Sequence, residues 1–299
     1  MMNAVTIPLY DHNEYVRLEA YLLHSSDEFQ LGRNRPAVIV CPGGGYLCTS
    51  DREAEPVALR FAAQGYQVFV LRYTTYFKEY VPDLNERPPG NPHSVFPQPL
   101  YDLALALLIV RRDSAKWRVD PDRITIVGFS AGGHLAACLG VHWADDFLYE
   151  RFNVDRGLLR PDALILGYPL VDHSLAMEAE KDEPFRELVY QAHFGHSNPT
   201  PEERKARSPV HFVTSRTPPT FLWHTADDDL VDARNSMKWA LALAENKVPY
   251  ELHIFESGVH GLSLADETSA AEEAHMNASC RIWFELALSW LRRKDKILR

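Results

Sequence analysis

The amino-acid sequence predicts an α/β protein built on a doubly wound, mostly parallel β-sheet. Two observations support this fold class. Short apolar runs rich in β-branched residues recur along the chain with little polar alternation, as expected for strands that are buried on both faces. Segments with helical character lie between these runs, and such alternation favours a parallel sheet with helices on both of its faces.

The predicted strands are spread over most of the chain and fit a sheet of about eight strands. The runs are Val16–Leu23, Ala37–Cys41, Gln67–Leu71, Ile124–Val127, Ala163–Leu166, Thr220–Trp223 and Glu251–Phe255.

The predicted helices fill the intervals between these strands. They are Ala54–Gln64, Gln98–Trp117, Ala131–Val141, Ala233–Glu245 and Ala271–Arg293. Gly65 is a plausible C-cap for the first of them. In the second helix, Leu100, Leu103 and Leu107 recur with the spacing of an amphipathic helix.

Two stretches interrupt the alternation. Residues 73–97 are rich in proline and predict a long surface loop. Residues 172–219, which follow the predicted strand Ala163–Leu166, taken as the sixth core strand of about eight, are highly charged and predict a small cap-like insertion with short helical pieces. Loops of this length are usually functional, and both follow strand ends, where open α/β sheets bind ligands. We find no repeat or interdomain linker and expect a single domain over residues 1–299.

Composition excludes several classes of partner. The chain has 299 residues and a formal net charge of −10, which argues against nucleic acid or an anionic membrane surface as the main partner. The N-terminus lacks the pattern of a signal peptide, and no apolar run approaches the length of about 18 residues that spans a membrane. The four cysteines show neither C-x-x-C spacing nor a Cys/His cluster, so we expect free thiols, no zinc site and a cytoplasmic location.

The segment VGFSAGGHLAA at 127–137 carries the strongest motif. Gly128, Ser130 and Gly132 have G-x-S-x-G spacing at the junction between a predicted strand and a predicted helix. A sharp turn at this junction would lift the Ser130 hydroxyl clear of the sheet edge, where it could act as a nucleophile. The alternative interpretation is a glycine-rich connection with an incidental serine.

A serine nucleophile needs a base, usually a histidine that a carboxylate orients. On a doubly wound sheet the chain order is serine, acid, histidine. His260 lies in a short polar loop after the last predicted strand, and Asp227, Asp228 and Asp229 follow the strand before it. The residues alone leave open which aspartate serves the histidine. Three further histidines are interpreted as structural because of their places in predicted elements: His134, His253 and His275.

The stretch CPGGGY at 41–46 predicts an oxyanion hole. It follows the strand Ala37–Cys41, and its glycines allow backbone N–H groups to face a ligand. These groups could stabilise a tetrahedral intermediate together with the N–H of Ala131. A phosphate cradle is the competing interpretation, but the Lys-Ser/Thr of a P-loop is missing. We therefore expect no cofactor and no metal.

Four segments in this order resemble the α/β-hydrolase superfamily: PGGGY at 42–46, GFSAGG at 128–133, WHTADD at 223–228 and VHG at 259–261. More specifically, they resemble its bacterial esterase/lipase branch, which is related to hormone-sensitive lipases and acetyl-xylan-esterase-like proteins. The resemblance extends from about residue 16 to the end of the chain. It implies an α/β-hydrolase fold with Ser130 as nucleophile and His260 as base.

The resemblance also implies the remaining site residues. The family pattern H-G-x-x-D-x-x-V, laid on residues 224–231, places the orienting acid at Asp228. The family motif H-G-G-G falls on residues 42–45 and implies that Gly44 and Gly45 serve the oxyanion hole. Pro42 departs from this motif and removes its histidine side chain, which puts the local support of the loop in doubt.

The sequence thus predicts a serine carboxylesterase. The charged insertion is too poor in apolar residues to bury a long acyl chain, so we expect small acyl groups from acetyl to butyryl. Tyr46, beside the insertion, is expected to contact the substrate. A sugar as the alcohol part is implied mainly by the resemblance. The alternatives are a peptidase similar to prolyl oligopeptidases and a non-catalytic binding protein on a hydrolase fold. A homo-oligomer is compatible with the sequence.

Overall fold

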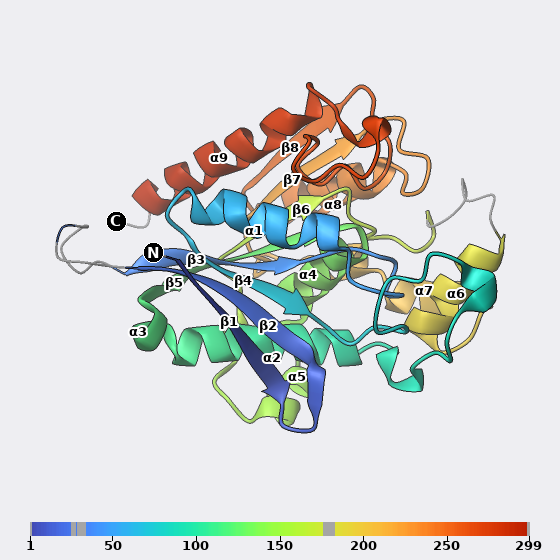
Figure 1. The fold of residues 1–299 in the computed structure, drawn as a ribbon, viewed down its shortest axis with the longest axis horizontal. Coiled ribbons are helices and arrows are strands. Elements are labelled where there is room, and N and C mark those ends of the chain that lie inside the picture. The colour runs from blue at the N-terminus through green and yellow to red at the C-terminus, as the bar shows by residue number, and fades with distance from the viewer. Residues whose placement is uncertain (1, 25–27, 29–33, 176–182, 298–299) are drawn as a thin grey trace.

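The computed structural model describes residues 2–24, 28, 34–175 and 183–297 (Figure 1). The described residues form one eight-stranded sheet with the strand order β1-β2-β4-β3-β5-β6-β7-β8. The strands are β1 (Met2–Tyr10), β2 (Asn13–Leu23), β3 (Arg35–Cys41), β4 (Gln67–Arg72), β5 (Val119–Phe129), β6 (Ala163–Gly167), β7 (Thr220–Thr225) and β8 (Tyr250–Phe255).

The sheet is mostly parallel, which confirms the predicted fold class. Strand β2 pairs antiparallel with both β1 and β4, and the other neighbouring strands pair in parallel. Every predicted strand is present. Strand β1 was missed because it is an edge strand whose residues are mostly exposed. Its extended form depends on pairing with β2, which local sequence patterning does not reveal.

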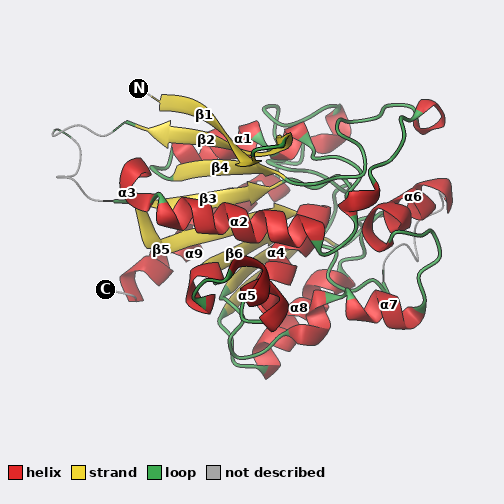
Figure 2. Ribbon diagram, turned by 90° about the horizontal axis from the view of Figure 1, so that it is seen from below, coloured by secondary structure: helices red, strands yellow, loops and turns green. Residues whose placement is uncertain are grey.

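Helices cover both faces of the sheet (Figures 1 and 2). The helices are α1 (Glu55–Ala62), α2 (Gln98–Arg112), α3 (Ser114–Trp117), α4 (Ser130–His142), α5 (Asp146–Phe152), α6 (Glu183–Phe194), α7 (Pro201–Ala206), α8 (Arg234–Glu245) and α9 (Trp283–Ile297). Side chains of α1 and α9 pack in the core on one face, and those of α2, α4 and α8 pack on the other. None of the described helices is both long enough and apolar enough to cross a bilayer.

Two predicted helices differ from the structure. The segment 98–117 is divided into α2 and α3, because Asp113 leaves the helical conformation between them. The last helix was expected from Ala271, but α9 begins at Trp283. Before it, the Asn277 side chain accepts hydrogen bonds from the N–H groups of Ser279 and Cys280, an Asx-type turn that competes with helix formation.

The parallel strands bring the predicted motifs to one edge of the sheet. The segments after β3, β5, β7 and β8 all leave the sheet at the carboxyl ends of their strands. The loop 73–97 follows β4, and α6 and α7 follow β6 within the predicted insertion. These helices extend beyond the sheet at this edge (Figure 2). The acidic residues at 178, 180 and 182, which contributed to the predicted charge of the insertion, lie outside the described residues.

Candidate active site

The nucleophile candidate sits at a strained strand–helix junction. Ser130 is the first residue of α4 and has a φ of +51°, a conformation that is unfavourable for a residue with a side chain. The turn is possible because Gly132 lets the backbone come close: a Cβ there would lie 2.0 Å from the carbonyl oxygen of Cys41. The local geometry is therefore that of the sharp turn expected from the G-x-S-x-G spacing.

Three of the predicted site residues form a hydrogen-bonded chain. His260 Nε2 lies 2.8 Å from Ser130 Oγ, and His260 Nδ1 lies 2.8 Å from Asp228 Oδ2. The residues come from the segments that follow β5, β7 and β8, so the parallel sheet brings them together from positions far apart in the sequence. A base within hydrogen-bond reach of the hydroxyl, itself held by a carboxylate, can take the hydroxyl proton.

The adjacent aspartates have different partners. Asp228 contacts His260 and is buried, and its Oδ1 accepts hydrogen bonds from the N–H groups of Leu230 and Val231. Asp227 instead accepts a hydrogen bond from the N–H of Gly258 at 2.7 Å, which braces the loop that carries the histidine. Asp228 is therefore the one of these two carboxylates that contacts His260.

A second histidine supports the carboxylate. His224 Nε2 lies 3.3 Å from Asp228 Oδ2, and its Nδ1 lies 2.8 Å from Ser236 Oγ. Burial alone would raise the pKa of Asp228, but the charge and hydrogen bond of His260, with the hydrogen bond of His224, hold that pKa well below its usual value. Asp228 therefore remains an acceptor for the Nδ1 proton of His260. His224 was visible as part of a motif, but no role was predicted for it.

The surroundings also tune the base. Burial alone would lower the pKa of His260, but the charge and hydrogen bond of Asp228 raise it, and Glu53 and Asp229 add to this effect, so the pKa lies above its ordinary value. The ring of Tyr168 packs against His260 edge-on, with the ring centroids 5.0 Å apart. These contacts fix the imidazole between Ser130 and Asp228.

The glycine loop after β3 has the backbone conformation expected of a donor loop. Gly44 has a φ of +119°, and a Cβ at this position would lie 2.4 Å from the carbonyl oxygen of Cys48. The N–H of Gly43 already donates to Glu53 Oε2 at 2.6 Å, which leaves Gly44 and Gly45 for a ligand. Both residues line the same cavity as Ala131, Ser130 and His260.

Glu53 is a buried carboxylate that sequence reasoning missed. In addition to the Gly43 amide, it accepts a hydrogen bond from the Tyr168 hydroxyl at 2.6 Å. The Tyr168 oxygen in turn accepts the N–H of Ser263 at 2.9 Å. Glu53 thus connects the glycine loop to the segment that follows His260. Its position in a polar stretch gave no signal, since burial decides its role.

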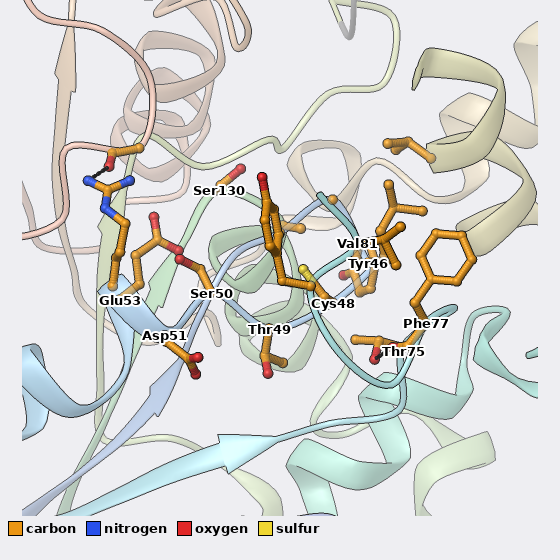
Figure 3. A pocket seen from close by; sticks show the side chains of 18 of the residues that line it. Tyr46, Cys48, Thr49, Ser50, Asp51, Glu53, Thr75, Phe77, Val81 and Ser130 are labelled. Carbon is orange, nitrogen blue, oxygen red and sulfur yellow. Dashed lines mark hydrogen bonds between the residues drawn. The ribbon is translucent and has the colours of Figure 1, made fainter. Parts of the chain in front are cut away.

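These residues open into a cavity of about 1140 Å³. Figure 3 shows Ser130 and Glu53 on one side of it and Phe77 and Val81 on the other. Cys48 also lines the cavity, but burial, with the nearby acidic charges, raises the pKa of its thiol to about 11. The thiolate is therefore scarce at neutral pH, and Ser130 is the better nucleophile in the cavity.

Tyr46 lines the cavity, where the sequence analysis placed a substrate contact. Its hydroxyl does not point freely into solvent, because it lies 2.6 Å from Nδ1 of His134 in the protein interior. His134 Nε2 lies 2.8 Å from the carbonyl oxygen of Arg207. That carbonyl can only accept, so Nε2 carries the proton and the Tyr46 hydroxyl donates to Nδ1. The expected substrate contact of Tyr46 remains a prediction.

Comparison with curated proteins relates the chain to esterases and xylan-degrading enzymes. It is 32% identical over 269 residues to endo-1,4-beta-xylanase B of Butyrivibrio fibrisolvens, covering 87% of this chain and 38% of that protein. The chain spans less than two thirds of the length of the curated relatives it matches, which include esterase LipQ and an acetylxylan esterase.

Solved structures match over nearly the whole chain. An acetyl ester-xyloside bifunctional hydrolase from Caldicellulosiruptor lactoaceticus is 36% identical with a TM-score of 0.70, covering 95% of this chain and 96% of that one. The carboxylesterase Cest-2923 from Lactobacillus plantarum WCFS1 is 28% identical with a TM-score of 0.78, covering 99% and 98%. Several homologues and structural neighbours are named esterases or carboxylesterases, which supports a carboxylic ester hydrolase. The BD-FAE family model matches residues 28–243, and the chain belongs to this family of α/β-hydrolase esterases.

Proposed function

We propose that the protein is a serine carboxylesterase that hydrolyses short-acyl esters, above all acetyl esters, of polyhydroxylated alcohols such as sugars. The observation that carries the proposal is the hydrogen-bonded chain from Ser130 through His260 to Asp228, with both distances at 2.8 Å. Its position at the carboxyl ends of parallel strands, beside a loop of free backbone donors, supports acyl transfer.

In the proposed reaction His260 acts first as a base and then as an acid in each half-reaction. His260 Nε2 takes the Ser130 proton as Oγ attacks the ester carbonyl, and Asp228 stabilises the imidazolium. The N–H groups of Gly44, Gly45 and Ala131 bind the oxyanion. His260 then protonates the departing alcohol, which leaves an acyl-enzyme on Ser130. Water, activated by the same histidine, hydrolyses this ester and restores the serine.

The acyl side of the cavity favours small groups. Helix α6 packs close to the glycine loop, so that a Cβ at Gly45 would lie 3.1 Å from Cγ2 of Val189. Phe185 of the same helix also lines the cavity. Side chains that approach the donor loop this closely leave little length for an acyl chain, and each extra methylene that stays in water forgoes about 0.8 kcal/mol of burial.

The opposite side of the cavity suits a polar alcohol. Arg72 and Asp51 both line it, and their side chains form an ion pair at 2.8 Å. Arg17, Lys78 and Tyr80 line the same region. Such a surface offers hydrogen-bond partners to hydroxyl groups and poor packing to a lipid. Two relatives are named acetylxylan esterase and acetyl ester-xyloside hydrolase, which supports an acetylated sugar as substrate.

The test is an ester panel with matched variants. We expect kcat/KM along a p-nitrophenyl series to be highest between two and four acyl carbons, and acetate release from acetylated xylose to be well above that from a triacylglycerol. Ser130→Ala should abolish both activities, whereas Ser50→Ala, which removes another hydroxyl from the same cavity, should retain them. A maximum at eight or more carbons would contradict the proposed acyl specificity, and an active Ser130→Ala variant would contradict the mechanism.

A further inference from the structure

A cluster of three buried histidines lies beside the candidate active site and takes no part in the proposed reaction. His134 comes from α4, His173 from the segment after β6, and His193 from α6. All three side chains are buried, and one ligand atom from each lies within 4.8 Å of the others. His173 and His193 line the wall of the cavity that holds Ser130.

Two of these histidines lack the hydrogen bonds that buried polar groups normally make. In the described part of the chain, neither ring nitrogen of His173 or of His193 has a hydrogen-bond partner. His173 is 2% exposed and His193 is 1% exposed. Leaving such groups unpaired is costly, and an unpaired buried nitrogen requires an explanation such as an ion or a water molecule.

The third histidine is arranged as a metal ligand usually is. His134 donates its Nε2 proton to the carbonyl oxygen of Arg207, which fixes the tautomer and leaves a lone pair on Nδ1. In the structure, this lone pair accepts a hydrogen bond from the Tyr46 hydroxyl. A metal ion on Nδ1 would displace this hydrogen bond, and the Tyr46 hydroxyl, which keeps its proton, would have to turn to another acceptor. All three imidazoles would then be neutral ligands of the same ion.

The geometry is compatible with a tetrahedral ion after small movements. Three atoms 4.8 Å apart have their common centre about 2.8 Å from each, and Zn–N bonds are about 2.0–2.1 Å, so shifts of less than about 1 Å are needed. Burial is the main cause that lowers the pKa of His134 to about 4 and those of His173 and His193 well below their ordinary value. Protons therefore compete weakly for the ligand nitrogens at neutral pH.

We propose that His134, His173 and His193 form a binding site for a divalent transition-metal ion of the zinc class. Imidazole nitrogens suit this class, and water from the adjoining cavity can fill the fourth position. The ligands belong to α4, which begins at Ser130, and to the insertion over 172–219. A bound ion would fasten the insertion to the nucleophile helix. No metal was expected from the cysteine pattern of the sequence. The three histidines lie 20 to 59 residues apart and form no spacing motif that would have indicated a site.

Nearby charges affect the affinity: Arg207 acts on all three histidines, and His173 also faces Arg204 and the opposing carboxylate of Asp172. The guanidinium of Arg207 lies 4.9 Å from the ring centre of Phe194 and donates a hydrogen bond to the carbonyl oxygen of His193. The charge of this group opposes that of a metal ion. We therefore expect binding weaker than in zinc sites that carry thiolates, and the titration should extend to roughly millimolar metal.

The experiment is metal titration of chelator-treated, dialysed protein at pH 7. With CoCl₂ the wild-type protein should bind about one ion per chain and show the visible bands of four-coordinate Co²⁺, which ZnCl₂ should remove. Zn²⁺ at 100 times its Kd should raise the Tm by about 5 °C or more. The His173→Gln and His193→Gln variants, on different segments, should each bind at least about tenfold more weakly.

The control is His211→Gln, which removes an exposed histidine and should leave both readouts unchanged. Absence of the four-coordinate spectrum or of a Tm shift in the wild-type protein would overturn the proposal and leave a buried water as the partner of these imidazoles. Equal affinities in the wild-type protein and a folded His173→Gln or His193→Gln variant would overturn it too, since the ion would then bind elsewhere. Because these measurements do not use ester hydrolysis, they are independent of the proposed activity.

Discussion

A partly buried histidine, His260, and two fully buried histidines, His173 and His193, lie near the same edge of the sheet and differ in their hydrogen-bond partners and charged neighbours. His260 has a partner on each ring nitrogen, Ser130 on one side and Asp228 on the other. His173 and His193 have no hydrogen-bond partner on either nitrogen within the described residues. The pKa of His260 is raised, whereas burial lowers the pKa values of His173 and His193.

The comparison shows that burial alone does not determine what a histidine can do. A carboxylate beside a buried imidazole stabilises its protonated form, so His260 can accept and return a proton near neutral pH. Without a carboxylate the imidazole stays neutral, and it can serve only as a hydrogen-bonding group or a ligand. The first arrangement suits proton transfer and the second suits metal binding.

The largest effect is expected at Ser130 and His260, the two residues between which the proton moves. Ser130→Ala or His260→Ala should lower kcat for p-nitrophenyl acetate about a million-fold, because members of such a unit lose nearly all activity singly. Circular dichroism should show an intact fold. Near wild-type turnover in either variant would contradict the proposed role of His260 as the base that activates Ser130.

The next largest effect is expected at Asp228, the carboxylate beside His260 that raises the pKa of this histidine. Asp228→Asn should lower kcat about 10⁴-fold, because an amide favours the wrong tautomer of His260. Asp227→Asn is the matched control and should lose far less, since this side chain holds only the Gly258 amide. The two variants can be compared in the same kinetic assay. A greater loss in Asp227→Asn would reverse the assignment.

A smaller effect is expected at Glu53. His260 must be neutral to accept the serine proton, so kcat/KM should fall as the pH drops through its pKa, which lies above the ordinary value of 6.5. Glu53→Gln should shift this fall in kcat/KM to lower pH, because the charge of Glu53 helps to raise the pKa of His260. The glutamine side chain has one acceptor oxygen for two donors, so either the Gly43 amide or the Tyr168 hydroxyl loses its partner, which should also lower kcat by about tenfold. Glu55→Gln, two residues away and exposed, should leave the profile unchanged.

The smallest effect is on stability in acid. In the metal-free protein the pKa values of His134, His173 and His193 are below the unfolded value near 6.5, so the unfolded chain binds more protons below that pH. The free energy of unfolding should therefore fall with decreasing pH, by at most about 1.4 kcal/mol per pH unit for each histidine. His260 contributes with the opposite sign.

Urea unfolding at pH 7, 6 and 5 in the presence of chelator would measure this slope. The slope for His173→Gln should be shallower than that for the wild-type protein, because glutamine does not titrate. Equal slopes for the two proteins would show that the buried imidazole of His173 does not stay neutral in the folded state.

The fold was predictable because its determinants are local. Buried parallel strands such as β3 and β6 are short continuous apolar runs, and the residues of the G-x-S-x-G turn are adjacent in the sequence. Strand β1 was missed because its conformation depends on its partner strand. The start of α9 was misplaced because side-chain capping at Asn277 overrides helical propensity.

The site was predictable only in part. Ser130 and His260 carry motifs, but the choice of Asp228 needed either a family pattern or the observed contact with His260. Glu53 and the histidine cluster carried no pattern at all. Their roles arise when the sheet and the insertion bring distant segments together, and spacing along the chain does not encode such contacts.

The most direct test of the account is labelling with a fluorophosphonate, followed by mass spectrometry of the digested protein. We predict one adduct on the peptide that contains Ser130, formed faster as the pH rises through the pKa of His260. Labelling should be lost in Ser130→Ala and retained in Ser50→Ala. Absence of an adduct on the wild-type protein, or an adduct that persists in Ser130→Ala, would contradict the claim that this hydroxyl is the activated nucleophile.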